Sequence, residues 1–239
     1  MTADAPLLRP RRRDPDANGI LVPTAYPFAT TTIAVVAVVV ITVLGFVLGH
    51  VDLGLAEALN TLHTGAVGAF TSDVYHVISP GPAIVVTVVV TGLIWALQRN
   101  IRPAAAFAGV VAITWVPSDL AKELVHRARP DTALLAHPFP VQPDPSYPSG
   151  HTVFMVAFVI ALTWLLRDTR AHTVAVVLGS LAVVVVAVSV SIDAVHYPSD
   201  ALASVAWALA VAPAARLVWV DLLMPRLPYL RPDRAITGP

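Results

Sequence analysis

Three short polar blocks in an otherwise apolar chain carry side chains that could bind a phosphate and act on it. They span residues 122–130, 148–151 and 196–200, and they include the only lysine of the chain. Charges and imidazoles are costly at the edge of a hydrocarbon core, so their clustering there indicates a functional site. Together the blocks supply cations for an anion, two histidines for nucleophilic and proton-transfer chemistry, and a carboxylate that could hold one histidine.

The first block places Lys122 and Arg129 seven residues apart, which is about two turns of a helix. Both side chains can therefore point to one side if the helix continues past the membrane edge. Arginine offers phosphate oxygens a planar fork of donors and lysine offers a point charge, so the pair could stabilise a five-coordinate phosphoryl transition state. The alternative is that both side chains snorkel from a helix end to water.

The second block, Ser149-Gly150-His151 after Pro148, directly precedes an apolar stretch. Ser149 can cap the helix, Gly150 lets a ligand come close to the backbone, and the free amides attract an anion. A protonated His151 at that anion could donate to a leaving oxygen. The alternative is an ordinary capping turn with an interfacial histidine.

The third block puts His196 four residues before Asp200, with Pro198 suited to the first turn of a helix. That spacing can bring both side chains to one face. A carboxylate on one ring nitrogen fixes the tautomer and leaves the other nitrogen with a free lone pair, as an imidazole nucleophile requires. The alternative is a structural His–Asp pair at a helix end.

Composition indicates a membrane protein. The chain is 56% apolar and 13% charged with a mean hydropathy of +0.74, whereas soluble domains are about 25% charged. Without cysteine it has neither disulfides nor thiolate metal sites, and its zero net charge gives no reason to expect a nucleic-acid partner.

We predict an all-α fold in which residues 26–220 form a bundle of six transmembrane helices. A disordered cytoplasmic tail at 1–25 and a cytoplasmic C-terminal tail at 221–239 flank it. Valine-rich runs are interpreted as helices because a backbone in lipid must satisfy its own hydrogen bonds. The predicted helices lie near residues 28–49, 82–97, 103–121, 151–166, 173–190 and 199–219.

The positive-inside rule sets the predicted orientation. With both termini in the cytoplasm, the basic residues left outside are Lys122, Arg127 and Arg129, so the site is expected at the extracytoplasmic membrane boundary. The outer segment 50–80 has no lysine or arginine, and we expect an amphipathic helix at the interface there. Its histidines are interpreted as interfacial polar residues: His50, His63 and His76.

Taken together, Lys-x6-Arg-Pro, Pro-Ser-Gly-His and His-x3-Asp resemble the type 2 phosphatidic acid phosphatase family, which includes the vanadium-dependent haloperoxidases. The resemblance covers roughly residues 28–220 and implies a lipid phosphatase that needs no metal or other cofactor. It implies that His196 is the nucleophile that forms a phosphohistidine, Asp200 its orienting partner and His151 the general acid. The implied phosphate ligands are Lys122, Arg129, Ser149 and the Gly150 amide.

One position departs from the family pattern, in which the third motif usually begins Ser-Arg. Here those residues are Ser189 and Val190, so a phosphate-binding arginine is missing. The loss of such a charge-assisted contact could cost about 1.5–3 kcal/mol. Arg127 could reach in from the first block, the substrate could carry compensating contacts, or the site could be impaired. Asp193 adds a further negative charge nearby.

The leading hypothesis is an integral phosphatase of the cell membrane that hydrolyses a phosphate monoester or diphosphate of a lipid. Phosphatidic acid, phosphatidylglycerophosphate and polyprenyl phosphates are all compatible substrates in the bilayer. The alternatives are a lipid phosphotransferase that uses the same site and a non-catalytic lipid-binding membrane protein with a degenerate site. A haloperoxidase is less expected, because those proteins are usually soluble.

Overall fold

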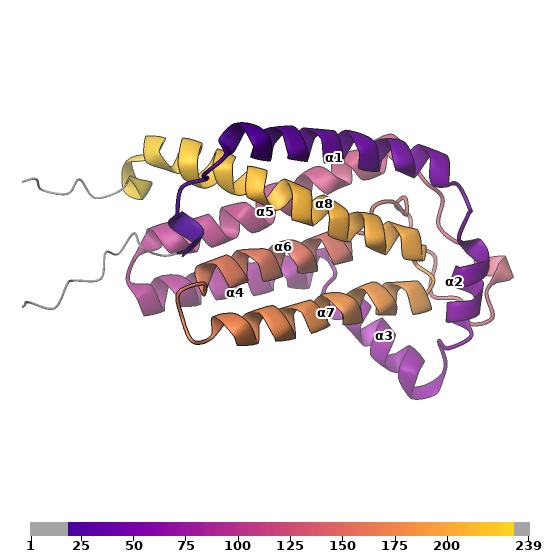
Figure 1. The fold of residues 1–239 in the computed structure, drawn as a ribbon. Helices are drawn as coiled ribbons and strands as arrows, with labels where there is room; N and C mark the ends of the chain where they lie inside the picture. The colour runs from indigo at the N-terminus through magenta and orange to yellow at the C-terminus, as the bar shows by residue number, and fades with distance from the viewer. Residues whose placement is uncertain (1–18, 232–239) are drawn as a thin grey trace, which may run out of the picture.

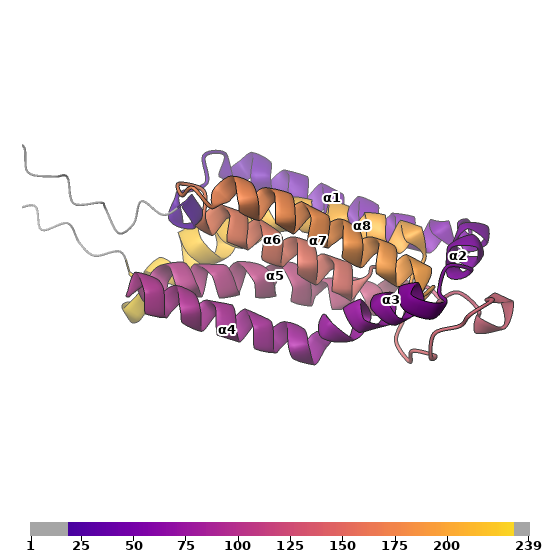
Figure 2. The same ribbon diagram turned by 90° about the horizontal axis from the view of Figure 1, so that it is seen from below.

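The computed structural model describes residues 19–231, and every regular element in that range is helical (Figure 1). Two short helices, α2 (Leu53–Asn60) and α3 (Gly65–Val77), lie at one end of a bundle, which we call the site end (Figure 2). Six longer helices make up the bundle: α1 (Pro27–Leu48), α4 (Pro80–Gln98), α5 (Ile101–Val125), α6 (Gly150–Leu165), α7 (His172–Ile192) and α8 (Pro198–Arg216).

Each of the six predicted apolar stretches forms a helix. Five helices are long and apolar enough to span a membrane: α1, α4, α5, α7, and α8 with its continuation to Arg226. Helix α6 has 16 residues and is the shorter one. It packs against α5, α7 and α8, and it buries Val153, Phe154 and Ala157 in the bundle. The all-helical prediction is therefore confirmed, while the sixth span remains a prediction.

Local sequence determines where the helices nearest the site begin and end. Pro80 and Pro198 stand in the first turns of α4 and α8, where the missing amide hydrogen costs nothing. Helix α5 ends at His126, which has a left-handed backbone (φ 53°). The chain then runs without a long helix until Ser149 caps α6. This connection carries most of the first block across the site end.

The predicted tails differ from the structure where they meet the bundle. Residues 1–18 and 232–239 lie outside the described range. The 3-10 turn η1 (Gly19–Leu21) is buried, and Ile20 belongs to the main hydrophobic core. Beyond α8, the π-helical η3 (Leu217–Leu223) continues the chain and Met224 is fully buried. These apolar side chains find buried surface at the end of the bundle opposite α2 and α3, so they are not solvated.

The segment 50–80 forms two helices, where one was predicted. Asn60 ends α2, and its side chain bonds the backbone of His137 in both directions as well as the carbonyl of Ile192. Two histidines of the segment 50–80 were predicted to be interfacial but have polar partners within the protein. The His50 Nδ1 lies 2.7 Å from the Tyr197 hydroxyl, and the His63 Nε2 lies 3.5 Å from a carboxylate oxygen of Asp193.

Candidate active site

The three polar blocks converge at the site end. Lys122 comes from the last turns of α5, Arg129 from the connection that follows, His151 from the first turn of α6, and His196 from the turn between α7 and α8. The ring centroids of the two histidines lie 6.3 Å apart. Lys122, Arg129 and His151 line a cavity of about 660 Å³.

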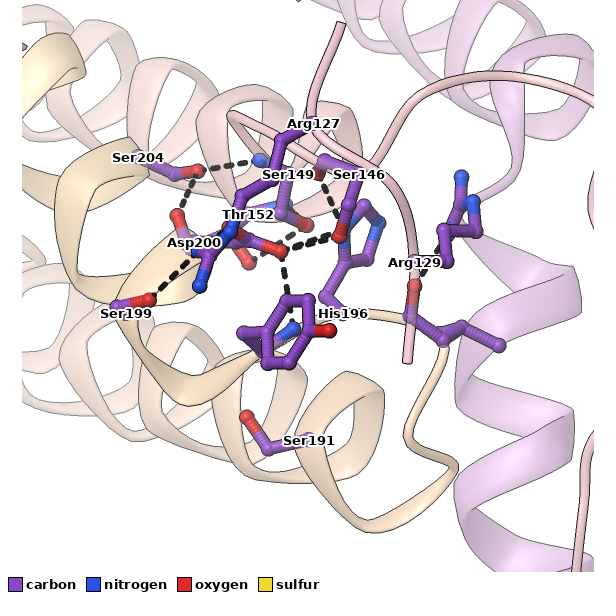
Figure 3. A network of polar contacts seen from close by, with 12 residues as sticks. Arg127, Arg129, Ser146, Ser149, Thr152, Ser191, His196, Ser199, Asp200 and Ser204 are labelled. Carbon is purple, nitrogen blue, oxygen red and sulfur yellow. Dashed lines mark hydrogen bonds and ion pairs between the residues drawn. The ribbon is translucent and has the colours of Figure 1, made fainter. Parts of the chain in front are cut away.

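His196 is fully buried, and its ring is held by the backbone (Figure 3). Its Nδ1 lies 2.7 Å from the carbonyl oxygen of Ser146. Because a carbonyl only accepts, Nδ1 carries the hydrogen and Nε2 keeps its lone pair. Burial, followed by the charges of Arg129 and Lys122, lowers the pKa of His196 well below its usual value. The imidazole is thus neutral, with the protonation state of a nucleophile.

Asp200 makes no hydrogen bond to His196, although a direct contact was expected, and it acts on His196 through Ser146. Its Oδ2 lies 3.6 Å from the His196 Nδ1, whose hydrogen bond goes to Ser146. The same carboxylate accepts from the Ser146 hydroxyl and from the Tyr197 amide, which it caps from the first turn of α8. Asp200 therefore fixes the loop whose carbonyl fixes the imidazole.

Arg127 does not take the place of the missing family arginine. It is buried, and its guanidinium donates to the hydroxyl of Ser199 and the carboxylate of Asp200 (Figure 3). It also donates to the carbonyl of Gly49 and the carboxylate of Asp52. It does not line the cavity that is lined by Lys122, Arg129 and His151. The carboxylates of Asp52 and Asp200 hold this guanidinium, so the structure does not bring Arg127 to the cavity with Lys122 and Arg129.

The two cations of the first block share one carboxylate that sequence reasoning missed. The Lys122 Nζ lies 2.6 Å from Oδ2 of Asp144, and the Arg129 Nη2 lies 2.8 Å from its Oδ1. Partial burial raises the pKa of Asp144, but hydrogen bonds and charge from both cations outweigh this and lower it to about 2. Asp144 lies between two prolines in an irregular segment, so no spacing rule could have linked it to the cations.

The second block divides its work between a helix cap and the cavity. The Ser149 hydroxyl accepts from the Thr152 amide, and the serine is fully buried. Gly150 and His151 line the cavity instead. The His151 ring stacks on Tyr75 from α3 with centroids 4.2 Å apart, a contact that the sequence did not indicate.

A Cβ at Gly150 would meet only ordinary contacts, the nearest at 3.7 Å to the Trp115 ring nitrogen. The surrounding protein therefore does not require a glycine at this position. Close approach of a ligand to the backbone remains the reason we expect for it.

Val190 fills its position with apolar packing. It is fully buried in a cluster with Tyr75, Phe139, Val195 and Ala201. Asp193 is fully buried as well and faces His63 rather than the cations. No arginine-sized gap is left at this position, and the extra carboxylate is directed away from the cavity.

The fold is that of a multi-pass helical membrane protein, and a cluster of cations and histidines lies at one end of its bundle. The chain belongs to the PAP2 superfamily, whose family model matches residues 102–223, just over half of the sequence. This match confirms the family resemblance.

The fold is similar to a crystal structure described as the first transmembrane PAP2 type phosphatidylglycerolphosphate phosphatase from Bacillus subtilis. The TM-score is 0.63 at 14% identity, over 83% of this chain and 95% of that one. No curated protein matches the sequence.

Proposed function

We propose that this protein is an integral membrane phosphatase that removes phosphate from a lipid monoester or diphosphate at the extracytoplasmic boundary. One observation carries the proposal. The Nε2 atoms of His151 and His196 are buried without a hydrogen-bond partner among the described residues, their rings lie edge to face, and His151 lines the cavity with Lys122 and Arg129. Two such unpaired nitrogens are costly unless a ligand engages both.

The proposed reaction has two steps. The neutral His196 Nε2 attacks phosphorus and the bond to the lipid oxygen breaks, while His151 donates its proton to that oxygen. Lys122 and Arg129 stabilise the charge on the phosphoryl oxygens. His151 then takes a proton from water, the water oxygen attacks phosphorus, and the phosphorus–nitrogen bond breaks. Inorganic phosphate leaves and His196 regains its lone pair.

The direct test is hydrolysis of a panel of lipid phosphates by the purified protein in detergent with EDTA. The family relationship supports hydrolysis, and we expect phosphate release that the chelator leaves unchanged. No group of three or more metal-ligating side chains occurs among residues 19–231. Lipid binding without release would favour the non-catalytic alternative, and phosphate appearing on an added acceptor lipid would favour the phosphotransferase.

Two residues that line the cavity are also exposed on the outside of the bundle, which supports sideways access for a lipid. The cavity wall includes Ile84 of α4 and Val116 of α5, which are 54% and 59% exposed on the outside of the bundle. The lipid chains would remain in the bilayer while the phosphate passes between these helices to Lys122.

Val116→Trp should therefore narrow this path. We expect about a tenfold lower kcat/KM on a long-chain lipid phosphate, or about 1.4 kcal/mol of transition-state stabilisation. Activity on a short-chain, water-soluble phosphate should change little. The matched control is Val88→Trp, an equally exposed valine of α4 that does not line the cavity. Equal losses on both substrates would contradict sideways access.

The buried neutral imidazole predicts a pH-dependent stability. Burial, with the charges of Arg129 and Lys122, lowers the pKa of His196 in the folded protein. Below about pH 6.5 the unfolded chain takes up a proton that the folded chain refuses, so stability falls as the pH falls. Melting temperatures in detergent between pH 7.5 and 5 should show this decline, and His196→Gln should reduce its slope. Parallel curves for the two proteins would count against a neutral His196.

A further inference from the structure

The Asp144 carboxylate occupies the position that a phosphate would need. Its Oδ1 and Oδ2 contact Arg129 and Lys122 respectively, and its backbone carbonyl accepts from the Arg129 Nε at 2.9 Å. The remaining Arg129 nitrogen, Nη1, donates to the Val195 carbonyl. This carboxylate thus bridges the two cations, and a phosphate that bridged them in the same way would have to take its place.

The carboxylate has room to move. Its side chain is 43% exposed, whereas those of Lys122 and Arg129 are 9% and 12% exposed. It lies in an irregular segment with Pro143 and Pro145 on either side, outside any helix. The anion is therefore the exposed partner of this ion-pair group, and the cations are the more buried ones.

Asp144 also stands between two cavities. Arg129, Gln142, Pro143 and Asp144 line both the 660 Å³ cavity that holds His151 and a second cavity of about 410 Å³. The second one is formed by the irregular chain after α5 together with Ala194 and Val195. Because Asp144 lines both cavities, a movement of its side chain would change the wall between them.

We propose that Asp144 is an internal competitor for the phosphate site, which gives way to the substrate and displaces inorganic phosphate after hydrolysis. This inference rests on the proposed function for its place in the cycle, but its central claim concerns anion binding alone. Asp119 and Glu123 also line the cavity, and the group formed by Lys122, Arg129 and the Asp144 carboxylate carries a net charge of +1. A phosphate dianion must replace that carboxylate, so its net affinity is reduced and its release is favoured.

The test measures anion binding, independently of turnover. Orthovanadate and inorganic phosphate are titrated against purified protein in detergent, and binding is followed by the rise in melting temperature. Asp144→Asn keeps the size and backbone of the side chain but removes its charge. We expect both anions to bind about tenfold more tightly to this variant, which corresponds to about 1.4 kcal/mol. In an activity assay, inhibition by product phosphate should become stronger by a similar factor.

Two further variants complete the experiment. Asp144→Ser also removes the carboxylate and should give the same tighter binding, even if the asparagine variant folds poorly. Asp131→Asn removes one charge from the same irregular segment, where Asp131 caps a 3-10 turn through the Ala133 amide and contacts neither cation. Its anion affinity should stay within about twofold of wild type.

The inference is tested by whether removal of the Asp144 charge strengthens or weakens anion binding. If Asp144 merely positions Lys122 and Arg129, its removal will weaken anion binding or leave it unchanged, and the inference fails. If the protein proves not to hydrolyse any lipid phosphate yet the Asp144 variants bind vanadate more tightly, only the proposed function fails.

Discussion

His196→Ala will lower turnover of a lipid phosphate by about 10⁴-fold or more, and no phosphorylated protein will form. The expectation follows from the loss of the nitrogen that we propose attacks phosphorus, since a missing nucleophile cannot be replaced by binding interactions. The measurement is incubation with radiolabelled lipid phosphate, a quench in alkaline detergent, and counting of protein-bound label. Wild type should carry a base-stable, acid-labile label of the kind a phosphohistidine gives.

The matched control is His151→Ala with an aryl phosphate, whose leaving group departs without a proton. Loss of a general acid costs about 10²–10⁴-fold on an alkyl substrate. With the aryl substrate His196 should still become phosphorylated, but the missing base should slow hydrolysis, so label accumulates. If His196→Ala is labelled as wild type is, the nucleophile has been misassigned.

Arg127→Gln will destabilise the fold strongly, and this is the second large effect we expect. The change leaves the buried carboxylate of Asp200 and the nearly buried one of Asp52 without their shared cation. Breaking such a buried pair from one side costs about 3–5 kcal/mol. Chemical or thermal unfolding in detergent measures the loss. Adding Asp200→Asn should recover part of the stability, because it removes one of the stranded charges.

Arg129→Gln separates the two possible roles of an arginine here. Arg129 lines the cavity and pairs with a partly exposed carboxylate, so its loss strands no buried charge and should cost less stability than the loss of Arg127. Vanadate binding should weaken instead. A variant of Arg127 that stays stable but no longer binds vanadate would show that Arg127 is the phosphate ligand after all.

The helices and the convergence of the three blocks could be predicted because both depend on local patterns. Apolar runs of span length must be helical in lipid, and helix ends on one side of a membrane lie near one another. Residues at such ends, including Lys122, His151 and His196, could be grouped without knowledge of any contact.

The partners of those residues could not be predicted, because they depend on the path of irregular chain. Ser146 reaches His196 through a backbone carbonyl, an atom that every residue has and no motif marks. Asp144 meets its cations across 22 and 15 residues of sequence. Arg127 looked like a possible phosphate ligand by its position, yet it pairs with Asp52, from a segment with no motif.

The short length of α6 affects how deep in the membrane the reaction would take place. Its 16 residues rise about 24 Å, short of the roughly 30 Å of a hydrocarbon layer. Arg167, Asp168 and Arg170 follow almost at once, and charges belong in water, so that end of α6 reaches the surface. The missing length therefore lies at the N-terminal end of α6, and His151 is expected to lie below the plane of the lipid headgroups. Narrow headgroups should therefore reach His151, whereas wide headgroups should be excluded from it.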